Sequence, residues 1–109
     1  MDFNAIFDQL KSDVIDLAKL TLKNYTDEAK NDALSFLEGS KDKLKKWTEL
    51  LAEGKLSIDE FEWLVQSQKD LAHMKLLYQK GLAEIRVDQF RNALVNLVID
   101  TILNLVPVP

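Results

Sequence analysis

The stretch LLAEGKLSIDEF, residues 50–61, contains the strongest turn signal in the sequence. Gly54 suits the left-handed backbone conformation that commonly ends a helix. Ser57, followed three residues later by Glu60, forms a capping box of the kind that begins a helix. The stretch therefore predicts that one helix ends near residue 53, that a turn covers 54–57 and that a second helix starts at residue 58.

Before this turn, apolar or small residues recur at steps of three or four, which is the spacing of one helical face. The series predicts a first arm from about residue 3 to 53. Asn24 or Thr26 can cap a new helix and Gly39 can end one, so a break at 24–26 or at 39–40 stays open. The series is Phe3, Phe7, Leu10, Val14, Leu17, Thr21, Tyr25, Ala29, Ala33, Phe36, Ser40, Leu44, Trp47 and Leu51.

After the turn, a second arm is predicted from residue 58 to about 106, where Pro107 and Pro109 stop the helix. The chain holds three Gly and two Pro in all, so helix breakers are scarce elsewhere. We expect one all-α domain over 1–109, an antiparallel hairpin with arms roughly 70 Å long at 1.5 Å per residue. The alternative is a three- or four-helix bundle, which follows if the first arm is broken.

Composition excludes several classes of function. Eighteen acidic against fourteen basic residues give a net charge of −4, which disfavours nucleic acid as a partner. The absence of Cys fits a reducing compartment, and we expect a cytoplasmic protein. The opening MDFNAIFDQL lacks the basic start of a secretory signal peptide, so export by that route is not expected.

The closing stretch NALVNLVIDTILNLVPVP, residues 92–109, is apolar around most of the predicted helix. Its polar side chains interrupt it too often for a membrane span, which needs about 20 predominantly apolar residues. No basic residue follows Arg91, so binding to anionic lipid is not expected either. One facing helix cannot cover so wide an arc, and we expect the start of the first arm and a second copy to cover it. The polar line consists of Asp88, Asn92, Asn96, Asp100 and Asn104.

An apolar ridge beside that polar line is the predicted interface between copies. Its members are spaced by four, four, four and three residues, so they follow one side of the helix. A two-fold axis lets such a ridge cover its own equivalent, which favours a homodimer or a higher even oligomer. The ridge consists of Phe90, Leu94, Val98, Ile102 and Leu105.

His73 is the only histidine, and Asp70 three residues before it lies on the same helical face. A carboxylate-bridged metal bundle needs further Glu residues facing inward from other helices, and the first arm has none on its apolar stripe. We therefore expect a partly exposed histidine, no metal and no cofactor. No Ser-His-Asp arrangement or Gly-rich phosphate loop accompanies it, so no catalytic residues are expected.

Three further features have an ordinary structural explanation. Four lysines in KDKLKKW alternate with acidic residues at ion-pairing distances, which favours a solvated helix face. Trp47 and Trp63 flank the turn and are expected to pack the end of the hairpin. Ala29, Ala33 and Ser40 predict close helix approach, with a groove for a partner helix as the alternative. The lysines are Lys41, Lys43, Lys45 and Lys46, and the acidic residues are Glu38, Asp42 and Glu49.

These features together predict a non-enzymatic assembly or adaptor protein that works through helix–helix association, coiled-coil-like packing and self-oligomerisation. Excess apolar surface and the lack of catalytic groups both favour this class. A membrane-active protein that inserts its apolar C-terminal segment is the alternative, and a metal-binding helical bundle is a second alternative. Possible partners are another copy or a helix of another protein.

Overall fold

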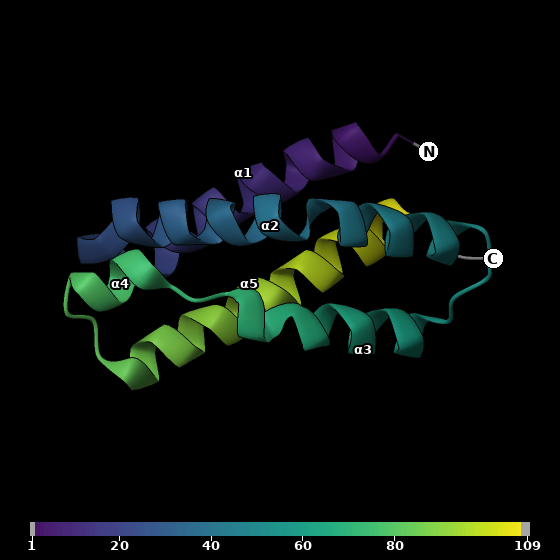
Figure 1. Ribbon diagram of the computed structural model, residues 1–109. Coiled ribbons are helices and arrows are strands. Elements are labelled where there is room, and N and C mark those ends of the chain that lie inside the picture. The colour runs from purple at the N-terminus through teal and green to yellow at the C-terminus, as the bar shows by residue number, and fades with distance from the viewer. Residues whose placement is uncertain (1, 108–109) are drawn as a thin grey trace.

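A computed structural model describes residues 2–107, and these residues form helices and turns without any strand. The all-α class is confirmed. The molecule measures 44 × 23 × 19 Å, with a Cα radius of gyration of 13.9 Å (Figure 1). The α-helices are α1 (Phe3–Thr21), α2 (Thr26–Ala52), α3 (Ile58–Ser67), α4 (Lys75–Gln79) and α5 (Glu84–Leu105), and the 3₁₀ segments are η1 (Lys23–Tyr25) and η2 (Gln68–Leu71).

The first arm is broken between α1 and α2, as in the alternative prediction. The chain therefore forms a bundle with a longest dimension of 44 Å, and not the hairpin whose arms would each be about 70 Å long. Leu22 leaves the helical conformation, and the Thr26 hydroxyl donates to the carbonyls of Leu22 and Lys23, both at 3.1 Å. These bonds add to the backbone bond from the Tyr25 N–H to the Leu22 carbonyl, at 2.9 Å, and fix the junction between α1 and α2. Thr26 is thus the first residue of α2 rather than its N-cap, while α2 runs unbroken through Gly39.

The turn between α2 and α3 has the predicted structure. Gly54 has a φ of 74°, in the left-handed region. The backbone N–H of Glu60 donates to the Ser57 hydroxyl, and the N–H of Ser57 donates to the Glu60 carboxylate, each at 3.0 Å. The capping box is therefore complete, and α3 begins at the predicted residue.

The second arm is broken twice, which corrects the prediction of one helix over 58–106. After α3 and η2, Met74 adopts a left-handed conformation with φ 54°, and Gly81 does so with φ 90° after α4. Asp32 of α2 accepts hydrogen bonds from the backbone N–H groups of Leu76, at 3.1 Å, and Leu77, at 2.9 Å. The start of α4 is thus capped by a buried carboxylate from another helix.

The C-terminal helix α5 crosses the molecule diagonally, from the end where α4 lies to the end with the α2–α3 turn (Figure 1). It contacts α1, α3, α4 and η2. The expectation that its wide apolar arc needs several neighbours is confirmed, and the same chain supplies them. Within residues 2–107, no helix combines the length and the apolar character needed to cross a bilayer.

Candidate functional site

The ridge predicted as an interface lies mostly inside the molecule. Phe90, Leu94, Val98 and Ile102 are buried, and only Leu105 is exposed, at 48%. The cover comes from α1, which packs along α5 and joins it through a hydrogen bond of 2.8 Å from the Thr101 hydroxyl to Asp13. In the single chain this ridge therefore presents little surface to a second copy, and its role as an interface stays a prediction.

The most exposed aromatic side chain is Trp63, at 70%. Its predicted packing at the end of a hairpin is wrong, whereas Trp47 is half-buried against the core, as expected. On α3 the buried side chains are Phe61 and Val65. Trp63 lies between them in sequence and is therefore about 200° round the helix from each, which turns it outward.

Trp63 borders a groove of about 530 Å³ between α3 and α5. The hydrogen-bonded pair of Gln66 on α3 and Asn96 on α5, at 2.9 Å, joins the two helices there, and buried Ile99 supplies an apolar surface. The lining residues are Asp59, Glu62, Trp63 and Gln66 from α3 and Asn96, Ile99 and Asp100 from α5. The polar line noted in the sequence thus provides one wall of the groove, and the outer face of α3 provides the other.

The charge of this groove has one sign. Asp59, Glu62 and Asp100 contribute carboxylates, and neither Lys nor Arg is among the lining residues. In the described part of the chain, none of the three carboxylates has an ion-pair partner. An indole and three negative charges therefore face solvent together, with the buried Ile99 behind them.

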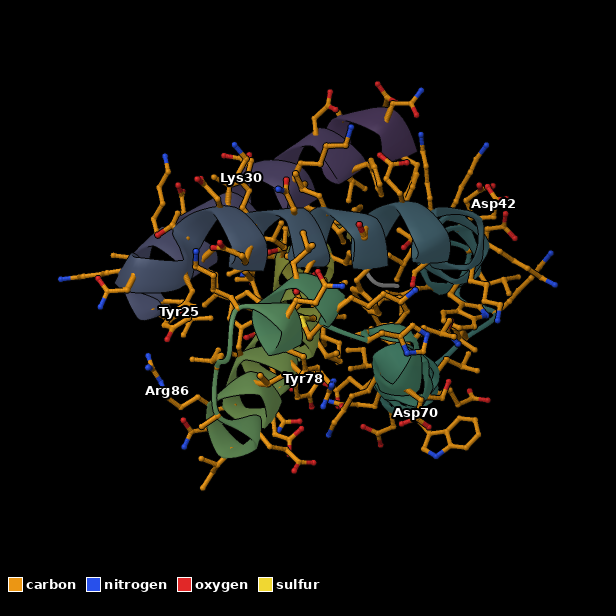
Figure 2. All side chains as sticks on the ribbon, turned by 60° about the vertical axis from the view of Figure 1, so that its left-hand side comes forward. Tyr25, Lys30, Asp42, Asp70, Tyr78 and Arg86 are labelled. Atoms are coloured by element: carbon orange, nitrogen blue, oxygen red, sulfur yellow. The ribbon has the colours of Figure 1, made fainter. Side chains whose placement is uncertain are left out.

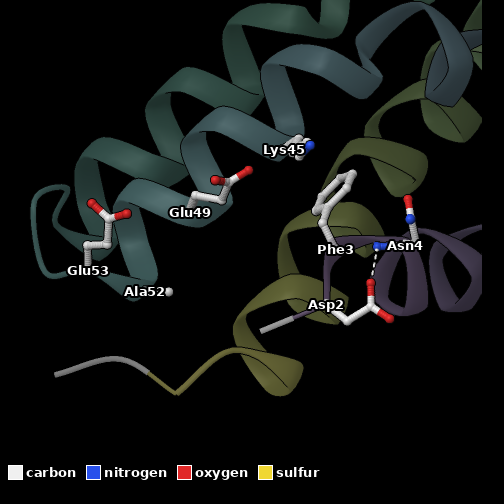
Figure 3. Close-up of a pocket in the computed structure, with 7 residues that line it drawn as sticks. All are labelled: Asp2, Phe3, Asn4, Lys45, Glu49, Ala52 and Glu53. Atoms are coloured by element: carbon white, nitrogen blue, oxygen red, sulfur yellow. Dashed lines mark hydrogen bonds between the residues drawn. The ribbon is translucent and has the colours of Figure 1, made fainter.

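A second groove, of about 540 Å³, lies between the start of α1 and the end of α2 (Figure 3). Lys45 stands there among carboxylates, so its charges are mixed. Asp2 is already engaged, because it accepts a hydrogen bond of 3.0 Å from the Asn4 backbone as the N-cap of α1. This groove therefore offers fewer uncommitted groups than the one beside Trp63.

His73 lines a cavity of about 460 Å³ between α2 and α4, and Asp70 is not among its lining residues. Asp32 also lines it, but both its oxygens are occupied by the start of α4. Over residues 2–107, no group of three or more His, Cys, Asp or Glu side chains is placed to hold a metal ion. The Asp70–His73 spacing thus has no further ligand around it.

The remaining sequence features lie on or beside α2. Ala29, Ala33 and Ser40 are buried, which fits close helix approach rather than an open groove. The Lys41 ammonium is 4.8 Å from the centroid of the Phe7 ring, so this lysine packs on α1. The other three lysines of the cluster are exposed, and Glu38 pairs with Lys11 of α1, at 3.7 Å, instead of with them.

Arg86 of α5 lies near Tyr25 (Figure 2). The guanidinium carbon is 6.0 Å from the centre of the tyrosine ring, which allows a cation–π contact. This contact links the start of α5 to the junction of α1 and α2. Among the grooves described above, the one beside Trp63 has the most carboxylates without a hydrogen-bond or ion-pair partner within residues 2–107.

Searches against family models, curated proteins and solved structures find no match for this chain.

Proposed function

We propose that this protein is a non-enzymatic adaptor that binds another protein through the groove between α3 and α5. The observation that carries the proposal is the 70% exposure of Trp63 beside that groove. Trp is enriched among the residues that contribute most to binding at protein interfaces. Its exposure on a free chain costs hydration free energy, which a partner recovers by covering the ring.

The surface used for association differs from the ridge expected from the sequence. Because four of the five ridge residues are buried, self-association through them has lost its structural support. A two-fold contact through the α3–α5 groove would bring like charges together, which is unfavourable. We therefore propose that the protein still acts through helix association, but with a helix of another protein and not with a second copy.

Selection of peptides from a display library of random 16-residue sequences tests this function. Sequences enriched on the intact protein should lose binding to Trp63→Ala. They should keep binding to Ile85→Ala, the matched control, since Ile85 is 69% exposed and does not line the groove. No enrichment, or binding that survives Trp63→Ala, would overturn the proposal.

A further inference from the structure

The groove between α3 and α5 also indicates the chemistry of its partner. This inference rests on the function proposed above and narrows it to one class of ligand. We infer that the groove accepts a short amphipathic helix of another protein, with an apolar residue against the Trp63 ring and with Lys or Arg beside the ring and the carboxylates.

The shape of the groove favours a helix. On α3, Asp59, Glu62, Trp63 and Gln66 are spaced by three, one and three residues, so they form a single ridge along the helix. On α5, Asn96, Ile99 and Asp100 form a second ridge with the same kind of spacing. A third helix can lay its own ridge between two such ridges. The seven residue steps from Asp59 to Gln66 correspond to about 10 Å, or roughly two turns of a bound helix.

The charge of the groove favours a cationic ligand. Asp59 and Glu62 stand on one wall and Asp100 on the other, so a positive side chain between the walls interacts with both. The absence of ion pairs to these carboxylates within residues 2–107 means that no described cation must be displaced first. Acidic ligands, including nucleic acid and anionic lipid, are repelled by the same charges.

Trp63 adds a second, independent preference for cations. The face of an indole ring attracts Lys and Arg more strongly than do other aromatic side chains. With 70% of Trp63 exposed, a guanidinium group can stack on the ring while it pairs with a nearby carboxylate. The same ring contacts the apolar side of an amphipathic helix, so it recognises both faces of the proposed ligand.

Three synthetic helices of identical apolar pattern provide the probes, with their polar positions filled by Lys and Arg, by Gln, or by Glu. Binding is followed by tryptophan fluorescence in a Trp47→Phe background, so that only Trp63 reports. The basic peptide should bind at least about tenfold more tightly than the neutral one, and its affinity should fall as NaCl is raised. The acidic peptide should not bind.

Neutralising the groove provides the matched comparison. The triple variant Asp59→Asn, Glu62→Gln, Asp100→Asn should lose most of the preference for the basic peptide. The control Asp8→Asn, Asp27→Asn, Asp42→Asn removes three exposed carboxylates from α1 and α2 and should keep that preference. Asp27 and Asp59 both lie in the first turn of a helix, which matches the two variants in their effect on helix stability. Trp63→Leu removes the fluorescent reporter and is therefore measured by isothermal titration calorimetry; it should weaken binding by roughly two- to fivefold, the value of an exposed cation–π contact.

The possible failures point to different errors. Equal binding of all three peptides that depends on Trp63 would overturn the cationic partner and leave the adaptor function standing. Binding of the basic peptide that is as strong to the groove triple variant as to its control would overturn the site. Sedimentation of the free protein as a dimer that Trp63→Leu dissociates would show that a second copy occupies the groove.

Discussion

At the scale of single residues, Asp32 contributes most to the arrangement of the second half of the chain. Its buried carboxylate accepts two backbone hydrogen bonds from α4, a helix of five residues. Such short helices are marginal by themselves, and most of their stability comes from tertiary contacts. Asp32 therefore holds the start of α4, in addition to the packing of the buried Leu77 in the core.

Replacing Asp32 by Ala should destabilise the protein by about 1–3 kcal/mol, because the buried N–H of Leu77 and the partly buried N–H of Leu76 lose their acceptor. Urea unfolding measures the loss. Asp42→Ala is the control on the same helix, since this carboxylate is exposed, and it should stay within about 0.5 kcal/mol of the parent. Equal effects of the two substitutions would contradict the role of Asp32.

Glu60 gives stability a small dependence on pH. The backbone N–H of Ser57, and secondarily its hydroxyl, holds the pKa of the Glu60 carboxyl below its ordinary value of 4.5. A lowered pKa in the folded state means that the stabilisation is present above pH 4.5 and is lost as pH falls through the folded pKa. Glu60→Gln should therefore lose this part of the pH dependence.

Urea unfolding of the parent and of Glu60→Gln between about pH 3 and 6 isolates that contribution, because the other carboxylates titrate in both proteins. The stability difference between the two should shrink toward acid pH. An NMR titration that places the Glu60 carboxyl at or above its ordinary pKa would contradict the prediction.

At the scale of elements, α5 is the helix against which α1, α3 and α4 pack. Its buried residues face α1 on one side and α3 and α4 on others, so its outward surface is reduced to the polar line and a few apolar side chains. The groove beside Trp63 exists because α3 covers only part of this helix and leaves Asn96 and Asp100 exposed.

Leu94→Ala should cost about 2–5 kcal/mol in the free energy of unfolding, the usual effect of truncating a fully buried Leu. Leu105→Ala, the control on the same helix, should cost less than about 1 kcal/mol because 48% of that side chain is exposed. Chemical denaturation of both variants compares them. If Leu94→Ala kept the parent's stability, the ridge would not be part of the core.

The sequence predicts elements whose signals are local. The turn from Gly54 to Ser57 follows from residues within a few positions of one another, and the polar line of α5 follows from spacing along one helix. The local capping signals at 24–26 leave a break between α1 and α2 open, but the break at Met74 follows from no local signal. The cap of α4 comes from Asp32, 44 positions before Leu76, and no local pattern reveals a contact over that separation.

The sequence predicts only the α5 wall of the candidate site. Asn96 and Asp100 belong to the polar line, but Trp63 was expected inside the molecule. The position of Trp63 beside the turn predicts packing at the end of a hairpin, although the i, i+4 spacing of the buried Phe61 and Val65 already turns Trp63 outward within α3. The sequence does not show that α5 lies beside this face, because the contact between Gln66 and Asn96 joins residues 30 positions apart.

At the scale of the whole molecule, the compact bundle and the straight hairpin differ in size. A rod of about 70 Å has a radius of gyration of roughly 20 Å, while a compact domain of this length has one of about 13 Å. The structure has 13.9 Å for its Cα atoms. Small-angle scattering of the protein should give a value near this, increased slightly by hydration.

Sedimentation equilibrium at micromolar concentration should give the mass of one chain, because four of the five ridge residues are already covered. The scattering profile of the same sample provides the control, since an elongated dimer raises both mass and radius. A dimer of extended hairpins would contradict the bundle. A dimer of compact chains would leave the bundle intact and contradict only the expected monomer.

The packing of α1 against α5 joins the first and last helices of the chain. Asp13 and Thr101, which hydrogen-bond across this contact, are 88 positions apart in sequence. While α5 is not docked, the apolar face of α1 is covered only in part, by α2. Contacts over such separations slow folding relative to bundles built from sequence neighbours. We therefore expect closure of the core by the first and last helices to limit the rate of folding.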